Sequence, residues 1–570
     1  MTFTGNIKGS GRLEVLADSG WVIMGTKCAD NAFTGDVQTN WTDNSNYGKM
    51  RLAADQPFGA NAGQGNIYGT LDMNGFSQIF KGLHNDGDKG SIYNNLTTLS
   101  TLTLDTTGKD LTFQSSIKGN IALVIKGTGK QTLSKTVAYT GSTTIESGTL
   151  ALTSNSSTSN KLYNLSGAGN LDYGSSPLEL FNTADTVFSG KLSGSGKLTF
   201  QNGSGWIELG LTADETFTGN VQINYANSNS QGRVRLGADN ALGTANRAFI
   251  YGTLDMNGHN QSFAGLSNDG NKGPIFNDAD TLSTLTIDNI SEDLRFQSSI
   301  SGNVALVLTG TENGKLTLAK APEYTGPTTV QAGTLALSQG GTLYNLSGGS
   351  ADLAAAIDST GKNLTLENTE NTKFIGSIAA AAITKTGEGT LKVNTGETGA
   401  IMASSLTVTG GEFDLLGSST GGLTISNAVF SPGNSVGAAE VGGAFTLTDG
   451  ASVIMEIGGS APSQNDSLVA SGDLELGDGK IYLTLADACD LPSGGQFTAV
   501  FSGSNSASIK NNFIDDHVIS YYFSDLAYVP YGEGQYAITG ILDANALPEP
   551  SAWLLLLCGA FGLLYFRKRK

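Results

Sequence analysis

The chain repeats itself over a long period, and this repetition limits the folds that it can adopt. The segment LSTLTLD at Leu99 returns as LSTLTID at Leu282, and IYGTLDMNG occurs at both Ile67 and Ile250, so that each pair is 183 residues apart. Other segments give offsets that differ by a residue or two, which defines a duplicated unit of about 184 residues. Because ordinary solenoid repeats are roughly 20–50 residues long, each unit must contain smaller structural repeats.

The local pattern within each unit is that of short β-strands. Segments such as TLTLD, LTFQ, ALVI and KLTF alternate or cluster apolar residues over four to six positions, as strands do. Gly, Asn, Asp and Ser lie between them, where turns need positive φ or side-chain-to-backbone hydrogen bonds. No segment before residue 547 has convincing helical spacing of apolar residues. The sequence therefore predicts an all-β chain.

The length of the repeated region favours a solenoid over a globular β-domain. Sandwiches and barrels rarely exceed about 250 residues, whereas a solenoid grows by adding turns. The two copies follow each other without a linker. We expect a long right-handed parallel β-helix, with roughly nine coils of about 20 residues in each unit. A string of separate sandwiches is the structural alternative.

This interpretation divides the chain into five parts. Residues 1–186 and 187–372 form the two repeat units, residues 373–440 a partial third repeat and residues 441–546 a final β segment, followed by a tail of residues 547–570. The first unit begins within a repeat, because FTGNIKGSGRLEVL at Phe3 matches FSGKLSGSGKLTF at Phe188. We therefore expect that a signal peptide lies upstream of Met1 or was lost.

The amino-acid composition argues against nucleic acid as a binding partner. The 570 residues carry a net charge of −19, only 15% of them are charged, and 77 are Gly. An acidic chain of low charge density has no electrostatic footprint for nucleic acid. The three cysteines, Cys28, Cys489 and Cys558, are too far apart for a metal motif. A disulfide between Cys28 and Cys489 remains an alternative to the simpler interpretation that both are free thiols.

Two segments carry a specific family resemblance. YTGSTTIESGTLAL from Tyr139 and YTGPTTVQAGTLAL from Tyr324 resemble the autotransporter-associated β-strand repeat. A third copy, ITKTGEGTLKV from Ile383, lacks the Tyr-Thr-Gly, and we expect an irregular coil there. The resemblance covers roughly residues 1–440 and implies a β-helical passenger of a surface protein. Gly148 should allow a corner to turn, and the two tyrosines should pack in the core rather than stack on carbohydrate.

The region after the repeats resembles the closing segment of such passengers. FSPGNSVG at Phe430 is followed by the apolar runs FTLTDGASVIMEIGG and NDSLVASGDLELGDGKIYLTL. Only about 100 residues then remain before the tail, too few for a passenger end and a translocator barrel with its many strands. We expect that this chain does not secrete itself through a pore of its own.

The tail predicts a transmembrane helix. Ala552–Phe566 is a run of 15 uncharged residues with Trp553 and Tyr565 at its ends, followed by four cations. As a helix it spans about 22 Å, against about 30 Å of hydrocarbon core, and interfacial aromatic and basic side chains extend that reach. A buried C-terminal helix is the alternative, but a helix that is apolar all round would need cover on every side.

The order of elements in the tail resembles the PEP-CTERM sorting signal. Its residues are Pro548, Glu549 and Pro550 before the helix, and Arg567, Lys568, Arg569 and Lys570 after it. The resemblance implies recognition by an exosortase-type membrane protease, with cleavage near the Pro-Glu-Pro. The helix would then be a transient anchor in the inner membrane. Positive-inside topology places the four cations in the cytoplasm and the β-helix outside, at the cell envelope or cell surface.

Signals for catalysis and metal binding are few. GSSTG (residues 417–421) and GNSVG (residues 433–437) have the letters of a hydrolase nucleophile elbow, but no helix is expected after either. His517 beside Asp515 and Asp516 does not complete a triad in this fold. Asp86 and Asp88 in NDGDKG could offer oxygens to Ca²⁺, although a solvated turn is favoured. No catalytic, cofactor-binding or metal residue is assigned.

Two function classes stay open. The favoured one is a non-enzymatic surface or matrix protein that acts in adhesion or in association with exopolysaccharide. The alternative is a polysaccharide lyase or glycosidase on a β-helix scaffold, which would need acidic and basic residues gathered on adjacent coils. The acidic residues appear scattered along the sequence, so we expect no enzymatic activity.

Overall fold

The computed structural model divides into two compact units. Unit 1 comprises Met1–Gly310 with Gly314–Gly326, and unit 2 comprises Thr311–Asn313 with the chain from Pro327 onward. The structure describes residues 1–543 except 17–19, 27–31, 44–45, 155–156, 202, 211–216, 245, 290–291, 312, 354, 397–398, 434–435 and 533. Cys28, Cys558, the predicted transmembrane helix and all seven sorting-signal residues lie outside the described residues.

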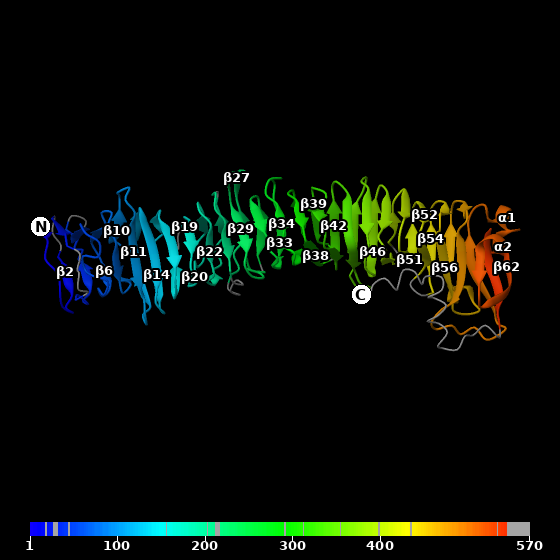
Figure 1. Cartoon of the computed structure of the whole chain (residues 1–570), viewed down its shortest axis with the longest axis horizontal. Helices are drawn as coiled ribbons and strands as arrows, with labels where there is room; N and C mark the ends of the chain where they lie inside the picture. Colours follow the sequence, from blue (N-terminus) through cyan, green and yellow to red (C-terminus); the bar gives the residue numbers. More distant parts are fainter. Residues whose placement is uncertain are drawn as a thin grey trace. The chain divides into compact units, whose positions relative to one another are not determined.

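Both units are parallel β-solenoids, as the repeat pattern predicts, with about 20 turns in all. In unit 1, β11 (Ser100–Asp105) pairs in parallel with β14 (Ile121–Lys126), which in turn pairs with β17 (Ser142–Ile145). Ser100 faces Ile121 and Leu123 faces Thr143, so one turn takes 21 and then 20 residues here. Figure 1 shows these strands stacked rung upon rung.

Columns of apolar side chains form the core. Along β11 the burial alternates residue by residue, with Leu102 and Leu104 fully buried and Thr101 and Thr103 turned outward. Leu102 lies directly over Leu123 of the next turn. Burying one such leucine stabilises the fold by about 1.5–3 kcal/mol. The period of two that predicts strands also predicts this column, because it fixes which side chains face inward.

The junction between the two sequence repeats is continuous. It falls inside unit 1, where β21 (Leu178–Phe181) pairs with β24 (Leu198–Phe200) and β22 (Thr186–Phe188) pairs with β25 (Ile207–Leu209), all in parallel. Leu180 of the first repeat lies opposite Phe200 of the second. A ladder that crosses the junction without a break excludes separate sandwiches for this part of the chain.

Unit 2 continues the parallel pattern through the partial third repeat. β45 (Leu364–Glu367), β47 (Ile383–Thr386) and β50 (Ser405–Val408) pair in sequence, each over at least three residues. The strands around the ITKTGEGTLKV segment thus keep a regular register although the segment lacks the Tyr-Thr-Gly of the other copies.

The last described part of unit 2 leaves the parallel ladder. β60 (Gln496–Ser502) and β62 (Phe523–Tyr531) are both antiparallel to β63 (Gln535–Leu542). Two short helices, α1 (Ser506–Ile509) and α2 (Phe513–His517), connect β60 to the strands that follow. The sequence pattern did not predict these helices, which are only a turn or so long and have no amphipathic repeat.

An aromatic cluster holds this terminal subdomain together. The rings of Phe513 and Tyr528 stack with centroids 3.8 Å apart and an interplanar angle of 13°. The Tyr528 hydroxyl donates to the carbonyl oxygen of Phe501 at 2.7 Å, and burial raises the pKa of Tyr528. The antiparallel strands and these rings cover apolar residues of the final turns, which protects a solenoid end from pairing with another chain.

Candidate functional site

The tyrosines and the glycine of the family motif are structural. Tyr139 is 1% exposed and shares a hydrogen bond of 2.9 Å with Thr143 Oγ1, and Tyr324 is fully buried. Gly148 has φ +73°, and a Cβ there would lie 2.6 Å from the carbonyl oxygen of Gly129. The predictions of core packing and of a glycine-dependent corner are confirmed, and neither tyrosine offers a face to a ligand.

The NDGDKG turn serves to join neighbouring turns. Asn85 is buried, donates to Ile67 O and Ser115 Oγ at 2.7 Å each, and accepts from Gln114 N at 2.7 Å. Asn268 in NDGNKG makes the corresponding three hydrogen bonds. The paired repeats therefore contain the same buried asparagine bridge.

The carboxylates proposed for Ca²⁺ have other neighbours. Asp88 is exposed and lies 3.2 Å from Lys135 Nζ and 3.4 Å from Lys89 Nζ, and these ammonium groups lower its pKa, Lys135 most. Burial of the ring, and then the Asp86 carboxylate, raise the pKa of Tyr68. Within the described ranges, no group of three or more His, Cys, Asp or Glu side chains is arranged to hold a metal ion.

The GSSTG segment lies at the end of a strand. In GSSTG, Ser419 is the last residue of β51 (Glu412–Ser419), is buried and donates to Gly421 O at 3.3 Å; another strand, β52 (Gly422–Ser426), follows it. His517 ends α2, with Nδ1 3.1 Å from Gly479 O and its ring against Phe513. Ser435 of GNSVG lies outside the described residues. The expected absence of a helix after GSSTG is confirmed.

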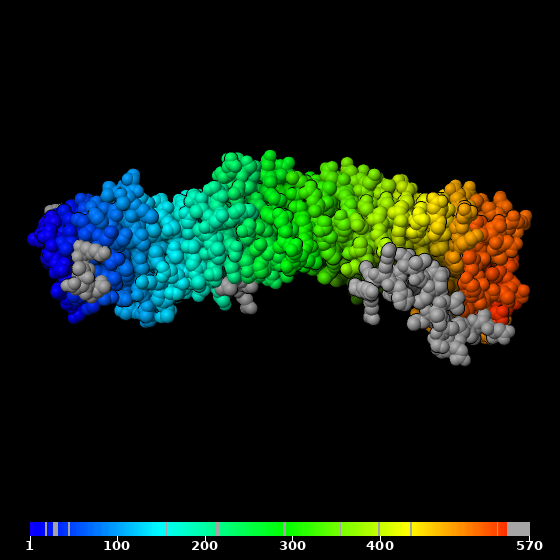
Figure 2. Space-filling view, in the orientation of Figure 1, coloured from blue at the N-terminus to red at the C-terminus, as the bar shows by residue number. Residues whose placement is uncertain are grey.

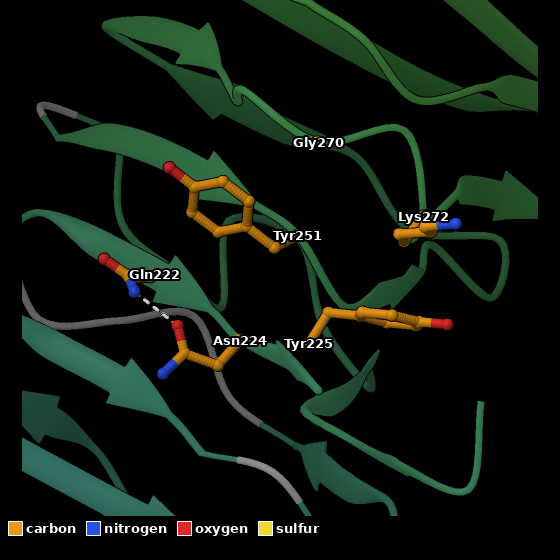
Figure 3. Close-up of a pocket in the computed structure, with 6 residues that line it drawn as sticks. All are labelled: Gln222, Asn224, Tyr225, Tyr251, Gly270 and Lys272. Carbon is orange, nitrogen blue, oxygen red and sulfur yellow. Dashed lines mark hydrogen bonds between the residues drawn. The ribbon is translucent and has the colours of Figure 1, made fainter. Parts of the chain in front are cut away.

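A pocket of about 290 Å³ opens on unit 1 in the second repeat. We call it the second-repeat pocket; Figure 3 shows the six residues that line it: Gln222, Asn224, Tyr225, Tyr251, Gly270 and Lys272. They come from three successive stretches of chain that neighbouring turns bring together. The sequence analysis did not identify this site, because its first and last residues are 50 positions apart.

Backbone pairing sets the positions of the two tyrosines. Tyr225 starts β27 (Tyr225–Asn227), which forms an antiparallel hairpin with β28 (Ser230–Gln231); Gly232 N closes the hairpin base on Asn224 O at 2.7 Å. Tyr251 directly follows β30 (Arg247–Ile250), and its amide donates to Ile223 O at 2.8 Å. The hairpin projects from the body of the unit (Figures 1 and 2), so the pocket lies beside a protrusion.

Side-chain contacts fix the pocket walls. Gln222 Nε2 donates to Asn224 Oδ1 (Figure 3), and Asn224 Nδ2 donates to Gln201 Oε1 of the previous turn at 2.8 Å. The ring of Tyr251 packs over Gly270, where an added Cβ would lie 3.7 Å from Cδ1. Burial and the nearby Asp269 carboxylate raise the pKa of Tyr251. The result is a hydrogen-bonded amide pair beside two half-buried aromatic rings.

The same constellation occurs in the first repeat. VQTNW (residues 37–41) corresponds to VQINY (residues 221–225). The residues that correspond in sequence to the lining of the second-repeat pocket are given the name first-repeat pocket on that ground: Gln38, Asn40, Trp41, Tyr68, Gly87 and Lys89.

The contacts within the two groups match. Gln38 Nε2 donates to Asn40 Oδ1 at 2.5 Å, as Gln222 does to Asn224. The Tyr68 amide donates to Thr39 O at 2.9 Å, and a Cβ on Gly87 would lie 3.9 Å from Tyr68 Cδ1. Trp41, which takes the place of Tyr225, is 38% exposed. The motif Val-Gln-x-Asn-aromatic, which occurs once in each repeat, was the sequence signal that could have revealed the site.

Unit 2 contains a cluster of acidic residues that contradicts the expectation of scattered acids. Asp414 on β51 is 3% exposed, with Oδ2 2.9 Å from Lys392 Nζ; burial, and then the charge of Glu412, raise its pKa. Asp466 is 1% exposed, and burial raises its pKa to about 8. Parallel stacking explains the cluster, because residues about 20 positions apart become neighbours.

Both buried carboxylates have structural partners. The two oxygens of Asp466 accept from the backbone amides of Gly437, at 2.7 Å, and Glu456, at 2.8 Å. Asp466 thereby ties a loop to β56 (Ser452–Ile457). Neither Asp414 nor Asp466 presents a surface on which a polymer could bind, since both are almost completely covered.

An all-β solenoid built from such repeats is the architecture of a passenger-like protein. Residues 123–152 and 306–337 match the family model described as passenger-associated-transport-repeat, which is associated with autotransporters. The matched stretches run from β14 to β18 (Thr149–Leu152) and from β38 (Val304–Gly310) to β42 (Gly333–Leu337), and they contain both Tyr-Thr-Gly motifs. No curated protein matches the chain. The repeat and the fold indicate a secreted or surface-exposed protein.

In the part of the chain that the structure describes, no helix is both long and apolar enough to cross a membrane.

Proposed function

We propose that the chain is a non-enzymatic, exported surface or matrix protein that associates with exopolysaccharide through its solenoid. The observation that carries the proposal is the pair of passenger-associated repeats within a parallel solenoid. A solenoid of this kind offers long, regular outer faces, and binding sites on such folds occur along extended surfaces. The duplicated pocket in unit 1 supplies aromatic rings and amides of the kind that bind sugars.

The C-terminal tail would act as a sorting signal. Pro548, Glu549 and Pro550 would be read by an exosortase-type protease while the segment 552–566 holds the chain in the inner membrane. Proline supports this role because it keeps the site extended and outside the helix. Arg567–Lys570 would stay on the cytoplasmic side. The mature protein would then be released to the cell envelope or the surface.

The sorting proposal is tested by fractionation in a host that carries an exosortase-type system, with mass determination of the mature C-terminus. We expect loss of Arg567–Lys570 from the exported protein. Replacing Pro548, Glu549 and Pro550 with alanine should block processing and leave insertion intact. Leu555→Arg should remove most of the anchoring, because exchanging a leucine for an arginine in this short segment costs roughly 3 to 4 kcal/mol on the insertion scale. Exported protein that keeps its four cations, unaffected by the alanine variant, would contradict sorting and indicate a permanent anchor.

A polysaccharide lyase or glycosidase is the second candidate, favoured by one observation. Asp414 and Asp466 have raised pKa values, and a carboxyl group with a raised pKa is what a general acid needs. Their burial argues for the structural role described above, and so we propose no turnover. The test is a screen of polysaccharides for new chain ends. Cleavage that Asp414→Asn or Asp466→Asn abolishes, with the fold intact, would reverse the choice.

A further inference from the structure

We propose that unit 1 carries two binding sites for a neutral glycan, the first-repeat pocket and the second-repeat pocket. This inference rests on the proposed association with exopolysaccharide and specifies the sites and the ligand chemistry.

The aromatic rings match the apolar face of a sugar. Tyr225 and Tyr251 are both half-buried, so each ring keeps part of its surface accessible beside the 290 Å³ pocket (Figure 3). The C–H face of a pyranose is apolar, and rings of Tyr and Trp provide large, rigid contact area at little conformational cost. The pocket volume is just below the roughly 300–1,000 Å³ of ligand pockets, which suits a small group such as a sugar ring.

The amide pair matches sugar hydroxyl groups. A side-chain amide both donates and accepts, as a hydroxyl does. Gln222 and Asn224 are already oriented by their mutual hydrogen bond and by Gln201, which lowers the entropy lost when a ligand binds. Lys272 adds a donor at the rim (Figure 3).

Charge favours a neutral ligand over a polyanion. The chain carries a net charge of −19, and Asp269 lies close enough to Tyr251 to raise its pKa. In the first-repeat pocket, Asp86 has the same relationship to Tyr68, and Glu14 accepts a hydrogen bond of 3.1 Å from Gln38. The cations of the first-repeat pocket are paired, Arg12 with Glu14 at 3.8 Å and Lys89 with Asp88 at 3.4 Å, so they leave no excess positive charge for a ligand that brings further negative charge.

The pocket residues are alike in both repeats, whereas some outward positions on other strands differ. Lys118 of β13 (Ser116–Gly119) corresponds to Ser301 of β37 (Ile300–Gly302), and Lys126 of β14 corresponds to Thr309. By contrast, the glutamine, asparagine, tyrosine, glycine and lysine of the pocket are identical, and the sixth residue is aromatic in both copies. The two copies therefore offer a ligand the same set of side-chain types.

The two pockets are separate sites. Strand β6 (Gly65–Ile67), which precedes Tyr68, lies in a four-stranded sheet, whereas β30, which precedes Tyr251, lies in a ten-stranded sheet. The 183 residues between the tyrosines correspond to about eight turns, or roughly 40 Å at 4.8 Å per strand. We therefore expect two independent sites per chain, each of modest affinity, with tighter apparent binding to a polymer that engages several sites.

The test is calorimetric titration of the full chain with neutral hexasaccharides (cellohexaose, maltohexaose and mannohexaose) and with hexagalacturonate. We expect at least one neutral hexasaccharide to bind with two sites per chain. Trp41→Ala or Tyr225→Ala should each remove one site, and the double variant should weaken binding at least tenfold. Tyr521→Ala is the matched control, because Tyr521 is a strongly exposed aromatic residue of unit 2.

A second pair of variants tests the pocket without removing its contacts. Gly87→Leu and Gly270→Leu should fill the space beside Tyr68 and Tyr251, since a Cβ at either position meets only ordinary contact distances. Each should remove one site while the thermal midpoint stays unchanged. Binding that survives both the Trp41→Ala/Tyr225→Ala and the Gly87→Leu/Gly270→Leu double variants, no binding of any neutral hexasaccharide, or binding of hexagalacturonate alone would overturn the inference.

Pelleting with crude exopolysaccharide separates this inference from the proposed function. If the chain pellets with the polymer while the neutral hexasaccharides fail, the pockets are not the sites and the proposed function stands. If neither binds, both fail.

Discussion

Lys385 places its ammonium group 2.6 Å from the carbonyl oxygen of Gly410, although its Cα stands in a column of buried apolar residues. On the strands before and after it, Leu366 and Val408 occupy the same column. The Nζ also donates to Gly387 O at 3.0 Å and Gly389 O at 2.6 Å. Burial lowers the pKa of Lys385 to about 8, so the group is still largely protonated at neutral pH and caps three carbonyl groups at a glycine corner.

We predict that Lys385→Met destabilises unit 2 by about 1–3 kcal/mol, because methionine fits the column but leaves buried carbonyls without a donor. The measurement is denaturant unfolding of the purified chain. Lys373→Met is the control, since Lys373 is exposed on β46 (Thr372–Ala380) and a surface substitution should stay within about 0.5 kcal/mol. Equal effects of the two substitutions would mean that the carbonyl cage contributes nothing.

The solenoid was predictable from local sequence, and Lys385 shows where prediction stops. Alternation of period two correctly placed Leu102 and Leu104 inward. The same alternation puts Lys385 inward, but its partner Gly410 is 25 residues away, and a hydropathy pattern does not indicate which carbonyls a corner exposes. The second-repeat pocket was not predicted for the same reason, because Gln222 and Lys272 come together only through the stacking of turns. Strand patterns are set by neighbouring residues, whereas contacts between turns depend on exact turn lengths.

Gly148 should tolerate no side chain. Its φ of +73° and the 2.6 Å approach of Gly129 O to an added Cβ combine backbone strain with a clash. We expect Gly148→Ala to cost about 2–4 kcal/mol in unit 1, of which the strain alone accounts for roughly 1–2 kcal/mol. Gly108 is the matched control, with φ +70° and open space around it. Thermal unfolding of both variants separates the two effects; a Gly148→Ala midpoint as high as that of Gly108→Ala would show that the corner can relax.

The buried Asp466 should make unit 2 more stable in mild acid. Its pKa is raised from 3.8 to about 8 in the folded state by burial. Between these values the folded chain holds a proton that the unfolded chain has released, so stability falls as pH rises from about 4 to 8. Asp466→Asn should flatten this slope, whatever it does to absolute stability.

The measurement for Asp466 is the denaturant midpoint at pH 5, 6, 7 and 8. Asp449→Asn, which replaces an exposed carboxylate of unit 2, should leave the slope as it is in the parent chain. A slope that persists in Asp466→Asn would assign the pH dependence to other groups, Asp414 first among them, because its pKa is raised too.

The central claim is that the chain associates with polysaccharide and does not cleave it. Measuring binding and polymer mass in the same sample tests this claim most directly. The purified chain is incubated with exopolysaccharide from a culture that produces the protein, then pelleted with the polymer, and the polymer mass is determined by light scattering. The account predicts that the chain pellets with the polymer and that the polymer mass stays constant over many hours. A falling polymer mass with new chain ends, or a chain that stays entirely in the supernatant, would contradict it.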